Sequence, residues 1–459
     1  MRIYRKKIIN FLNNRIKIIK LLDFFQSTHI FKYKAFLEKT QFWNSEELKK
    51  LQDRKLSNLL KWAYETVPFY KKQFNKLNFY PNITKNPRDK LLKIPIIKKS
   101  DIQENIHKFV SKKKIRYKIE KTSGSTGKPT KFLKDFNTIS MGSACFYREL
   151  NWYGYNIGDP YVWLWGGRPV ESIVKKFIEY IRNLLRNIKK FDTHRFNNEK
   201  LRQIYDYIKF LEPSIIYGYV SSIDLLAEFI DSKNLDPLEV GSIVTSAEKL
   251  QSIKREKFRK IFKTDIFDQY GTTEITSIAG ECEKQLGLHI NMEHVFLELI
   301  KDGERIVDPN IEGEVVLTDL DNYKMPLIRY NIEDIATFKK GICECGRESD
   351  LLSTVKGRHS DIIKGLNGNK VHGEFFAHLF ESTNFDDLTN LKQFQVVQDN
   401  ISHLLINLVV KRRPKYKKIR ELKKIVFRYL GDIDIDFNFV DSIPRSESGK
   451  LKYVISQVN

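Results

Sequence analysis

Short apolar segments alternate with helix-like segments from about residue 115 onward. Four of them have the length and composition of strands: Tyr161–Leu164, Ser214–Tyr217, Ser242–Thr245 and Asp265–Tyr270. Strands that alternate with helices form a sheet covered by helices. The sequence therefore predicts an α/β core.

Two further regions follow this core. Residues 295–338 contain three strand-like segments between turn residues, which predicts a small β-rich subdomain. These segments are Val295–Ile300, Gly313–Leu317 and Ile335–Phe338. The last hundred residues contain strand-like segments at 393–398, 404–410 and 435–440 and a basic helix-like segment at 414–430. We therefore expect a large α/β domain with several subdomains, followed by a small α+β lobe.

The N-terminal part precedes this alternation. Residues 45–79 are expected to be helical, with Ser45 near the helix start, and 86–110 to be a loop-rich connection with a short helix. Residues 1–25 interleave basic and apolar side chains, which fits an amphipathic helix on an anionic membrane surface. The alternative is a helix that packs on its own domain with a solvated basic face.

Composition narrows the class of protein. The formal charge of +23 invites a nucleic-acid partner, but Lys, Ile and Asn are abundant along the whole chain and no nucleic-acid-binding module is recognisable. We therefore expect no nucleic-acid ligand. No apolar run is long enough to span a bilayer, and no secretory signal is recognisable, so a cytoplasmic location is expected.

The strongest local motif is the loop Lys121–Pro129, which reads Lys-Thr-Ser-Gly-Ser-Thr-Gly-Lys-Pro. Glycines let backbone N–H groups approach phosphate oxygens, hydroxyls donate hydrogen bonds, and Lys128 adds positive charge. The spacing is not that of a Walker A loop, which needs Ser or Thr where Pro129 stands. The motif predicts triphosphate binding, against the alternative of a flexible turn.

Five motifs together resemble the adenylate-forming superfamily of acyl-CoA synthetases, adenylation domains and luciferases. They occur in that superfamily's order across residues 122–450. The five are Thr122–Pro129, Tyr270–Glu274, Arg329–Asp334, Gly357–Asp361 and Pro444–Lys450. Within the superfamily, Phe42–Asn44, Leu60–Tyr70, Gly287–Asn291 and Met325–Tyr330 resemble phenylacetate–CoA ligase-like and capsular-polysaccharide CapK-like proteins. The likeness covers roughly residues 42–455.

The resemblance implies a role for each motif. Glu274, next to Thr273, is the expected Mg²⁺ ligand, Asp334 the partner of the ribose hydroxyls, and Lys450 the bridge between the substrate carboxylate and the α-phosphate. Arg358 is expected at the ribose or a phosphate. The remaining residues expected around ATP are Thr122, Ser123, Gly124, Ser125, Thr126, Gly127, Lys128, Ala247, Glu248, Tyr270, Gly271 and Thr272.

The resemblance also implies a domain organisation. A basic segment (1–40) would precede a large ATP- and acyl-binding domain (41–358) and a small mobile lid (359–459), with the hinge near Arg358–Asp361. Two positions depart from the motifs: Glu333 stands where Gly usually precedes the Asp, and Ser360 where many relatives have Asp or Lys.

Three of the four cysteines come with a histidine at metal-ligand spacing. Cys282 and His289 are separated by six residues, and Cys343 and Cys345 by one. A Cys₃His set is a standard closed zinc site, and a long gap between its halves is normal. The alternative is reduced cysteines with a histidine that faces the substrate pocket.

The sequence leaves the substrate and acceptor open. Aromatic candidates for the acyl pocket are Trp152, Tyr153, Trp163, Trp165 and Tyr217–Tyr219, although such residues are more often core. The first functional hypothesis is an AMP-forming acid–thiol ligase that transfers its acyl group to CoA. The second is an enzyme of cell-surface polysaccharide assembly that delivers the group to a carrier thiol, an amine or a hydroxyl. The third is a non-catalytic, membrane-associated binding protein.

Overall fold

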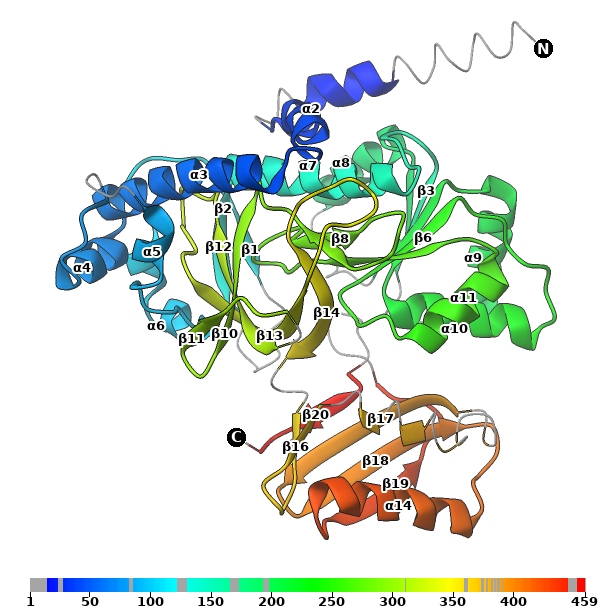
Figure 1. Cartoon of the computed structure of the whole chain (residues 1–459). Helices are drawn as coiled ribbons and strands as arrows, with labels where there is room; N and C mark the ends of the chain where they lie inside the picture. The colour runs from blue at the N-terminus through cyan, green and yellow to red at the C-terminus, as the bar shows by residue number, and fades with distance from the viewer. Residues whose placement is uncertain are drawn as a thin grey trace, which may run out of the picture. The chain divides into compact units, whose positions relative to one another are not determined.

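The computed structural model covers most of the chain and divides into two compact units (Figure 1). The large unit is Met1–Ile332 with Ala336–Val355, and the small unit is Glu333–Ile335 with Lys356–Asn459. The structure describes residues 15–23, 28–81, 86–121, 130–165, 173–192, 198–309, 311–358, 362–372, 375–376, 379–380, 383, 385, 389, 391–444 and 452–458. The expected division into 1–40, 41–358 and 359–459 stays a proposal.

The large unit combines helices with one large sheet and a hairpin. Its helices are residues 15–23, α2 (Ile30–Thr40), α3 (Ser45–Thr66), α4 (Pro68–Lys76), α5 (Pro87–Leu91), α6 (Lys99–Phe109), α7 (Phe136–Trp152), α8 (Ile173–Leu185), α9 (Asn198–Leu211), α10 (Val220–Ser232) and α11 (Ser252–Phe262). Its strands are β1 (Tyr117–Lys121), β2 (Lys131–Asp135), β3 (Tyr161–Leu164), β4 (Ile188–Phe191), β5 (Ile215–Gly218), β6 (Ser242–Ser246), β7 (Ile266–Tyr270), β8 (Ala279–Glu281), β9 (Leu288–Ile290), β10 (Val295–Lys301), β11 (Glu304–Ile306), β12 (Glu312–Asp319), β13 (Tyr330–Lys339) and β14 (Leu351–Arg358).

The central sheet is mixed and contains twelve strands within the described residues. Its order is β11-β10-β12-β13-β14-β9-β8-β7-β6-β5-β3-β4. From β4 to β7 the neighbours are parallel, and from β7 through β8 and β9 to β14 they are antiparallel. The four strands expected in the α/β core are confirmed as β3, β5, β6 and β7.

The β-rich region expected at 295–338 is confirmed as strands β10, β12 and β13, but these strands do not form a sheet of their own. Strands β10, β12 and β13 belong to the same sheet as the α/β core. The connection is made by β14, which pairs with β9 at Leu351↔His289. A pairing between segments 62 residues apart leaves no local signal in the sequence, so the two halves looked independent.

Helix α3 begins as its sequence dictates. The side chain of Asn44 accepts from the backbone N–H of Glu47, and the Glu47 carboxylate accepts from the backbone N–H of Asn44, which is a capping box. The cap is therefore Asn44, and Ser45 is the first helical residue. The connection at 86–110 contains two helices, α5 and α6, rather than the one expected.

A buried ion pair joins three parts of the large unit. Arg148 of α7 donates to Glu293 at 2.7 Å and to Asn291 at 2.6 Å, and Thr40 of α2 donates to Glu293 at 2.6 Å. The two charged side chains are fully enclosed, and such charges are tolerated only when paired and hydrogen-bonded. Together with Ile30 and Leu37, which are buried in the same core as α7, these bonds make α2 an integral part of the large unit.

The small unit is an α+β lobe, as expected. Its strands are β15 (Ile362–Lys364), β16 (Lys370–His372), β17 (Leu391–Asn400), β18 (His403–Val410), β19 (Asp434–Phe439) and β20 (Val454–Ser456), and its helices include α14 (Tyr416–Leu430). Four of the strands form a sheet in the order β19-β18-β17-β20, and α14 buries Leu422, Val426 and Leu430 in this unit's core.

Candidate functional site

The predicted nucleotide-binding residues of the large unit follow neighbouring parallel strands. Strands β5, β6 and β7 pair in parallel, so their carboxyl ends meet at one edge of the sheet. Ala247 and Glu248 come directly after β6, and the turn Gly271–Glu274 comes directly after β7. Ligands of open α/β sheets bind at this edge. The structure thus brings these predicted residues to one edge.

The turn after β7 has a fixed shape. The Thr272 backbone N–H donates to the Ile275 carbonyl at 3.0 Å, and the Ile275 N–H donates back to the Thr272 hydroxyl at 3.0 Å. A Cβ at Gly271 would lie 3.0 Å from the Ser277 nitrogen, so the backbone crossing leaves little room there for a side chain. The turn holds Glu274 in a buried position and leaves Thr273 exposed.

Lys134 is a residue of this site that the motifs did not indicate. It lies in β2, its side chain is buried, and its ammonium donates to the Thr276 hydroxyl at 2.8 Å and to the Thr273 carbonyl at 3.2 Å. Burial lowers the pKa of Lys134, while the carboxylates of Asp319, Glu120 and Glu274 act in the opposite direction. The ammonium therefore ties the β1–β2 hairpin to the turn that carries Glu274.

The predicted phosphate loop connects the two strands of that hairpin. Strands β1 and β2 pair in antiparallel fashion, with Lys121 opposite Lys131. Residues 122–129, which include Thr122, Ser123, Gly124, Ser125, Thr126, Gly127 and Lys128, lie outside the described residues, as does Lys450. A loop between two antiparallel strands also differs from a Walker A loop, which joins a strand to a helix.

The segment after β6 combines backbone strain with a helix terminus. Ala247 has φ +65°, in the left-handed region that L-residues other than Gly rarely adopt, and such positions cluster at functional sites. The Glu248 carboxylate accepts from the Ser221 backbone N–H at 2.7 Å and from its hydroxyl at 2.9 Å. Glu248 thus stabilises the N-terminus of α10, which is a structural role beside the predicted one at the nucleotide.

The Arg329–Asp334 motif lies at the start of β13. Arg329 is buried and donates to Glu298 at 3.1 Å and to the carbonyl of Ile94 at 2.7 Å, so its role is structural. Asp334 lies in the stretch Glu333–Ile335 that groups with the small unit, and its side chain is buried. Arg358 ends β14.

Glu333 explains how this motif keeps its shape without glycine. Its φ is +68°, the left-handed conformation that glycine adopts at no steric cost. We therefore expect the free energy of unfolding of Glu333→Gly to exceed that of Glu333→Ala by about 0.5–1 kcal/mol, the removed strain being partly offset by glycine's larger loss of entropy. Chemical denaturation measures this change, and Glu333→Ala, which keeps the strain, is the control. A glycine variant no more stable than the alanine variant would contradict the explanation.

The four predicted zinc ligands come together. The Sγ atoms of Cys282 and Cys343 are 3.6 Å apart, Cys345 Sγ is 3.3 Å from His289 Nε2, and the four ligand atoms all lie within 4.8 Å of one another. A disulfide would need about 2.05 Å. In a tetrahedral Cys₃His site with Zn–S of about 2.3 Å and Zn–N of about 2.0 Å, the ligand atoms lie roughly 3.5–3.8 Å from one another. The set therefore fits a closed zinc site.

The surroundings suit His289 and the thiols for metal binding. Burial, followed by the charge of Arg347, lowers the pKa of His289 to about 4, so the ring is neutral at pH 7 and has a lone pair to offer. Its Nδ1 lies 3.0 Å from the Ser349 hydroxyl, which leaves Nε2 for a metal. Burial raises the pKa of Cys282 to about 12, so forming its thiolate costs free energy. Binding of a metal to the thiolate would offset that cost.

A second group of possible ligands, His294, Asp319 and Asp321, is largely bonded to protein groups, although the buried Nε2 of His294 has no hydrogen-bond partner among the described residues. His294 Nδ1 lies 2.9 Å from Asp321, which also pairs with Lys55 at 2.7 Å. Thr138 donates to Asp319 at 2.8 Å. We assign this buried network a structural role.

The aromatic candidates for the acyl pocket make two sets of ring contacts. Trp163, Trp165, Tyr217 and Tyr219 lie together in and directly after β3 and β5, with the Trp165 and Tyr219 ring centroids 4.0 Å apart. The Nε1 of Trp163 is buried and has no hydrogen-bond partner among the described residues. Trp152 and Tyr153 pack in the same apolar core as Trp163, Trp165 and Tyr217 but make other ring contacts. Trp152 contacts Arg347 and His289 of the Cys/His cluster, and the Tyr153 ring stacks on Phe267.

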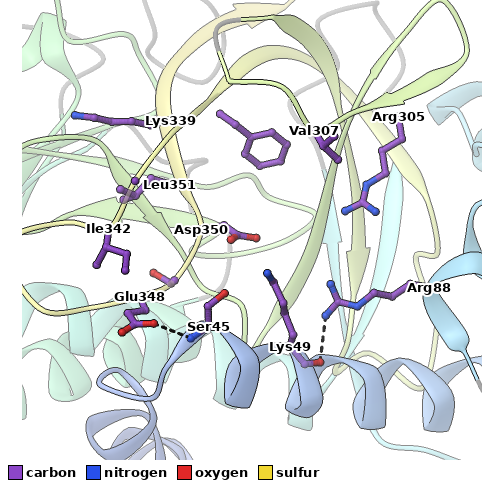
Figure 2. Close-up of a pocket in the computed structure, with 13 residues that line it drawn as sticks. Ser45, Lys49, Arg88, Arg305, Val307, Lys339, Ile342, Glu348, Asp350 and Leu351 are labelled. Atoms are coloured by element: carbon purple, nitrogen blue, oxygen red, sulfur yellow. Dashed lines mark hydrogen bonds between the residues drawn. The ribbon is translucent and has the colours of Figure 1, made fainter.

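A pocket of about 480 Å³ lies between α3, α5 and the segment 338–351 (Figure 2). Its charged lining residues are Lys49, Arg88, Arg305, Lys339, Glu348 and Asp350. No predicted site residue of the described part of the chain lines it. It adjoins the Cys/His cluster through Ser349 and is distinct from the sheet edge that carries Glu274.

The fold and these motifs agree with comparisons to known proteins. Residues 363–457 match the model of the CapK C-terminal domain. The chain is 24% identical to the protein CapK of Staphylococcus aureus over 90% of both chains. It is 26% identical to the phenylacetate–coenzyme A ligase of Thermus thermophilus, covering 70% of this chain and 73% of that one. A 2-hydroxyisobutyryl-CoA ligase, solved in the postadenylation state with an adenylate, shares the fold with a TM-score of 0.73 at 18% identity, covering 92% of each chain.

A large mixed sheet followed by a small α+β lobe is the fold of the adenylate-forming enzymes. Within that superfamily, the chain is similar to CapK and to the phenylacetate–coenzyme A ligases, and its C-terminal residues match the CapK C-terminal domain.

Proposed function

We propose that this protein activates a carboxylic acid with ATP, forms an acyl-adenylate with release of pyrophosphate, and transfers the acyl group to CoA. The observation that carries the proposal is the turn Gly271–Glu274 at the carboxyl edge of the parallel strands, held by Lys134. Attack of a carboxylate on the α-phosphate needs alignment and charge neutralisation rather than a protein nucleophile. A buried carboxylate and a buried ammonium at one turn supply that environment.

The residues at this edge fit ATP and Mg²⁺. The Glu274 carboxylate is a hard oxygen ligand of the kind Mg²⁺ prefers, and Mg²⁺ would neutralise phosphate charge. Tyr270 and Ala247 would face the base, and Thr272 and the loop 122–129 the phosphates. Asp334 and Arg358 would hold the ribose or a phosphate, and Lys450 the reacting carboxylate and α-phosphate. These roles rest on the motifs.

The acid is proposed to have an apolar or aromatic body. The rings of Trp163, Trp165, Tyr217 and Tyr219 gather at the carboxyl ends of β3 and β5, which end at the same sheet edge as β6 and β7. The buried Trp163 N–H offers one donor for a polar atom of the acid. The likeness to phenylacetate–coenzyme A ligases supports this substrate class.

The similarity to CapK supports a different acceptor for the acyl group. The CapK relative matches over 90% of the chain, and the CapK domain model covers most of the small unit. The alternative is therefore an adenylate-forming enzyme of cell-surface polysaccharide biosynthesis that delivers the acyl group to a carrier-protein thiol, an amine or a hydroxyl. A non-catalytic binding protein is disfavoured, because Glu274, Asp334 and Lys450 are all present.

Analysis of the reaction products tests whether CoA is the acceptor of the acyl group. The protein is incubated with ATP, Mg²⁺ and a panel of aryl, arylacetic and short-chain acids, with and without CoA, and thioester and AMP are measured by mass spectrometry. The proposal predicts an acyl-CoA product with at least one acid. Adenylate formation without any CoA-dependent product would instead assign the alternative acceptors.

Glu274→Gln tests the magnesium role. The variant keeps the shape of the side chain and loses its charge, so we expect the rate of adenylate formation to fall by about 100-fold. The rate is measured as release of pyrophosphate at saturating acid. Glu256→Gln, an exposed change on α11 that removes only an ion pair with Arg259, is the control and should leave the rate unchanged. A Glu274→Gln rate within threefold of wild type would remove Glu274 from the site.

A further inference from the structure

Helix α8 carries its apolar residues on the outside. Val174, Phe177, Ile178, Ile181 and Leu184 follow helical spacing, so they share one face, and their side chains are 37–66% exposed. Tyr180 beside them is 62% exposed. We call the five aliphatic and aromatic residues of this stripe the α8 face. Surface helices normally bury such a stripe, and a contiguous exposed apolar face marks an interaction site.

The polar side of α8 lies against the protein instead. Glu179 and Arg182 are both partly buried, and Glu179 pairs with Lys190 of β4 at 3.6 Å. Burial and then the charge of Arg186 lower the pKa of Arg182. The orientation of α8 is thus fixed by polar contacts on its inner side, and the α8 face is left for a partner.

The helix at residues 15–23 extends this surface. The Arg15 side chain donates to the carbonyl of Leu184 at 2.8 Å, so the two helices touch. Ile18 and Leu21 of this helix are 44% and 55% exposed. Lys17, which precedes Ile18, and Lys20, which precedes Leu21, are exposed as well. Figure 1 shows α8 on the edge of the large unit that carries the N-terminal helices.

The surroundings are strongly cationic. Residues 15–23 and 173–191 together contain nine lysines and arginines and two acidic residues. The whole chain averages only about one net positive charge per twenty residues, so this segment is cationic beyond the general composition. Burial lowers the pKa of Lys118 of β1, as do the charges of Arg182 and Arg186, while Glu120 acts in the opposite direction. Cations held this close to one another favour an anionic partner.

These observations separate three occupants of the α8 face. A second copy of the chain, packed about a two-fold axis, would bring two cationic rims together. Residues 1–14 of this chain contain four basic and no acidic residues, so their charge is no better matched. An anionic bilayer offers an apolar layer for the α8 face and phosphate groups for its rim.

We propose that α8 and the helix at residues 15–23 form a surface that docks on an anionic lipid bilayer, with the α8 face inserted at the level of the headgroups. Among the described helices, none has both the length and the apolar character to cross a bilayer. The mode of contact is therefore a helix lying in the interface plane. This proposal is independent of the proposed reaction and assigns the contact to α8 as well as to the N-terminal segment.

The experiment uses the full-length protein and two kinds of vesicle, phosphatidylcholine alone and phosphatidylcholine with phosphatidylglycerol. We expect binding to the anionic vesicles and at least tenfold weaker binding to the neutral ones, measured by co-sedimentation. The double variant Phe177→Glu with Ile178→Glu should reduce partitioning onto anionic vesicles by about tenfold or more, because it removes two apolar side chains and repels the headgroups. Phe210→Glu, a change of the same chemistry at a side chain 87% exposed on α9, is the matched control.

Each contrary result overturns the proposal. Unchanged vesicle binding by the double variant would show that α8 is not the contact. An equal loss in Phe210→Glu would show that binding is non-specific. A wild-type dimer that the double variant dissociates, with no vesicle binding, would assign the α8 face to self-association. Thermal unfolding of both variants, whose replaced side chains are all more than half exposed, verifies that the fold is retained.

Discussion

Lys450→Ala is expected to lower the rate of adenylate formation by about 1,000-fold while ATP still binds. The resemblance places the Lys450 ammonium between the substrate carboxylate and the α-phosphate, where negative charge develops in the transition state, and removing one such group typically costs 10²–10³ in rate. Most of the residues proposed to bind ATP lie in the large unit, so we expect the dissociation constant for ATP to change by less than about threefold.

Lys452→Ala is the matched control for this change. Lys452 is an exposed lysine two residues further on and two residues before β20, which pairs with β17 at Val396↔Val454. The control removes the same charge from the same part of the small unit and should leave the rate unchanged. Equal activity of Lys450→Ala and wild type would show that the motif Pro444–Lys450 has been matched to the wrong function.

Removal of zinc is the second change with a large expected effect. We propose that Cys282, His289, Cys343 and Cys345 hold one structural Zn²⁺ per chain, which links the β8–β9 region to the segment before β14. Chelation of the metal should lower the apparent unfolding temperature by about 10 °C or more, because buried thiols would lose the ion that stabilises their thiolates. Metal content by mass spectrometry and thermal unfolding measure the two effects.

Two variants separate the metal site from ordinary cysteine burial. Cys343→Ser should lose the zinc and the stabilisation together. Cys145→Ala changes a fully buried cysteine in α7 that lies outside the cluster, so the metal content should remain one zinc per chain whatever its effect on stability. Purified wild-type protein without zinc, and with the same unfolding temperature before and after chelation, would remove the proposal.

The elements of this fold could be predicted from the sequence because their signals are local. The apolar segments that became β3, β5, β6 and β7 lie between turn residues and helices. The joining of residues 295–338 to the same sheet could not be predicted, because it depends on the pairing of Leu351 with His289. Such a pairing between distant segments is decided by packing, which periodicity does not encode.

The candidate site shows the same limit. The motif around Tyr270–Glu274 and the Cys/His spacing indicated residues that the structure brings to one sheet edge and into one cluster, respectively. The role of Lys134 could not be predicted, because nothing in the sequence distinguishes it from the many other lysines. Only the folded hairpin places its ammonium beside Thr273. Ala247 and Glu333 likewise show their left-handed backbone only in the structure.

Exchange of labelled pyrophosphate into ATP measures the activation of an acid as its adenylate without any acceptor. We expect exchange that depends on Mg²⁺ and on one class of carboxylic acid, and that is abolished or strongly reduced in Glu274→Gln and Lys450→Ala. If no acid stimulates exchange in a protein that binds ATP and carries its zinc, the proposed activation of an acid is wrong.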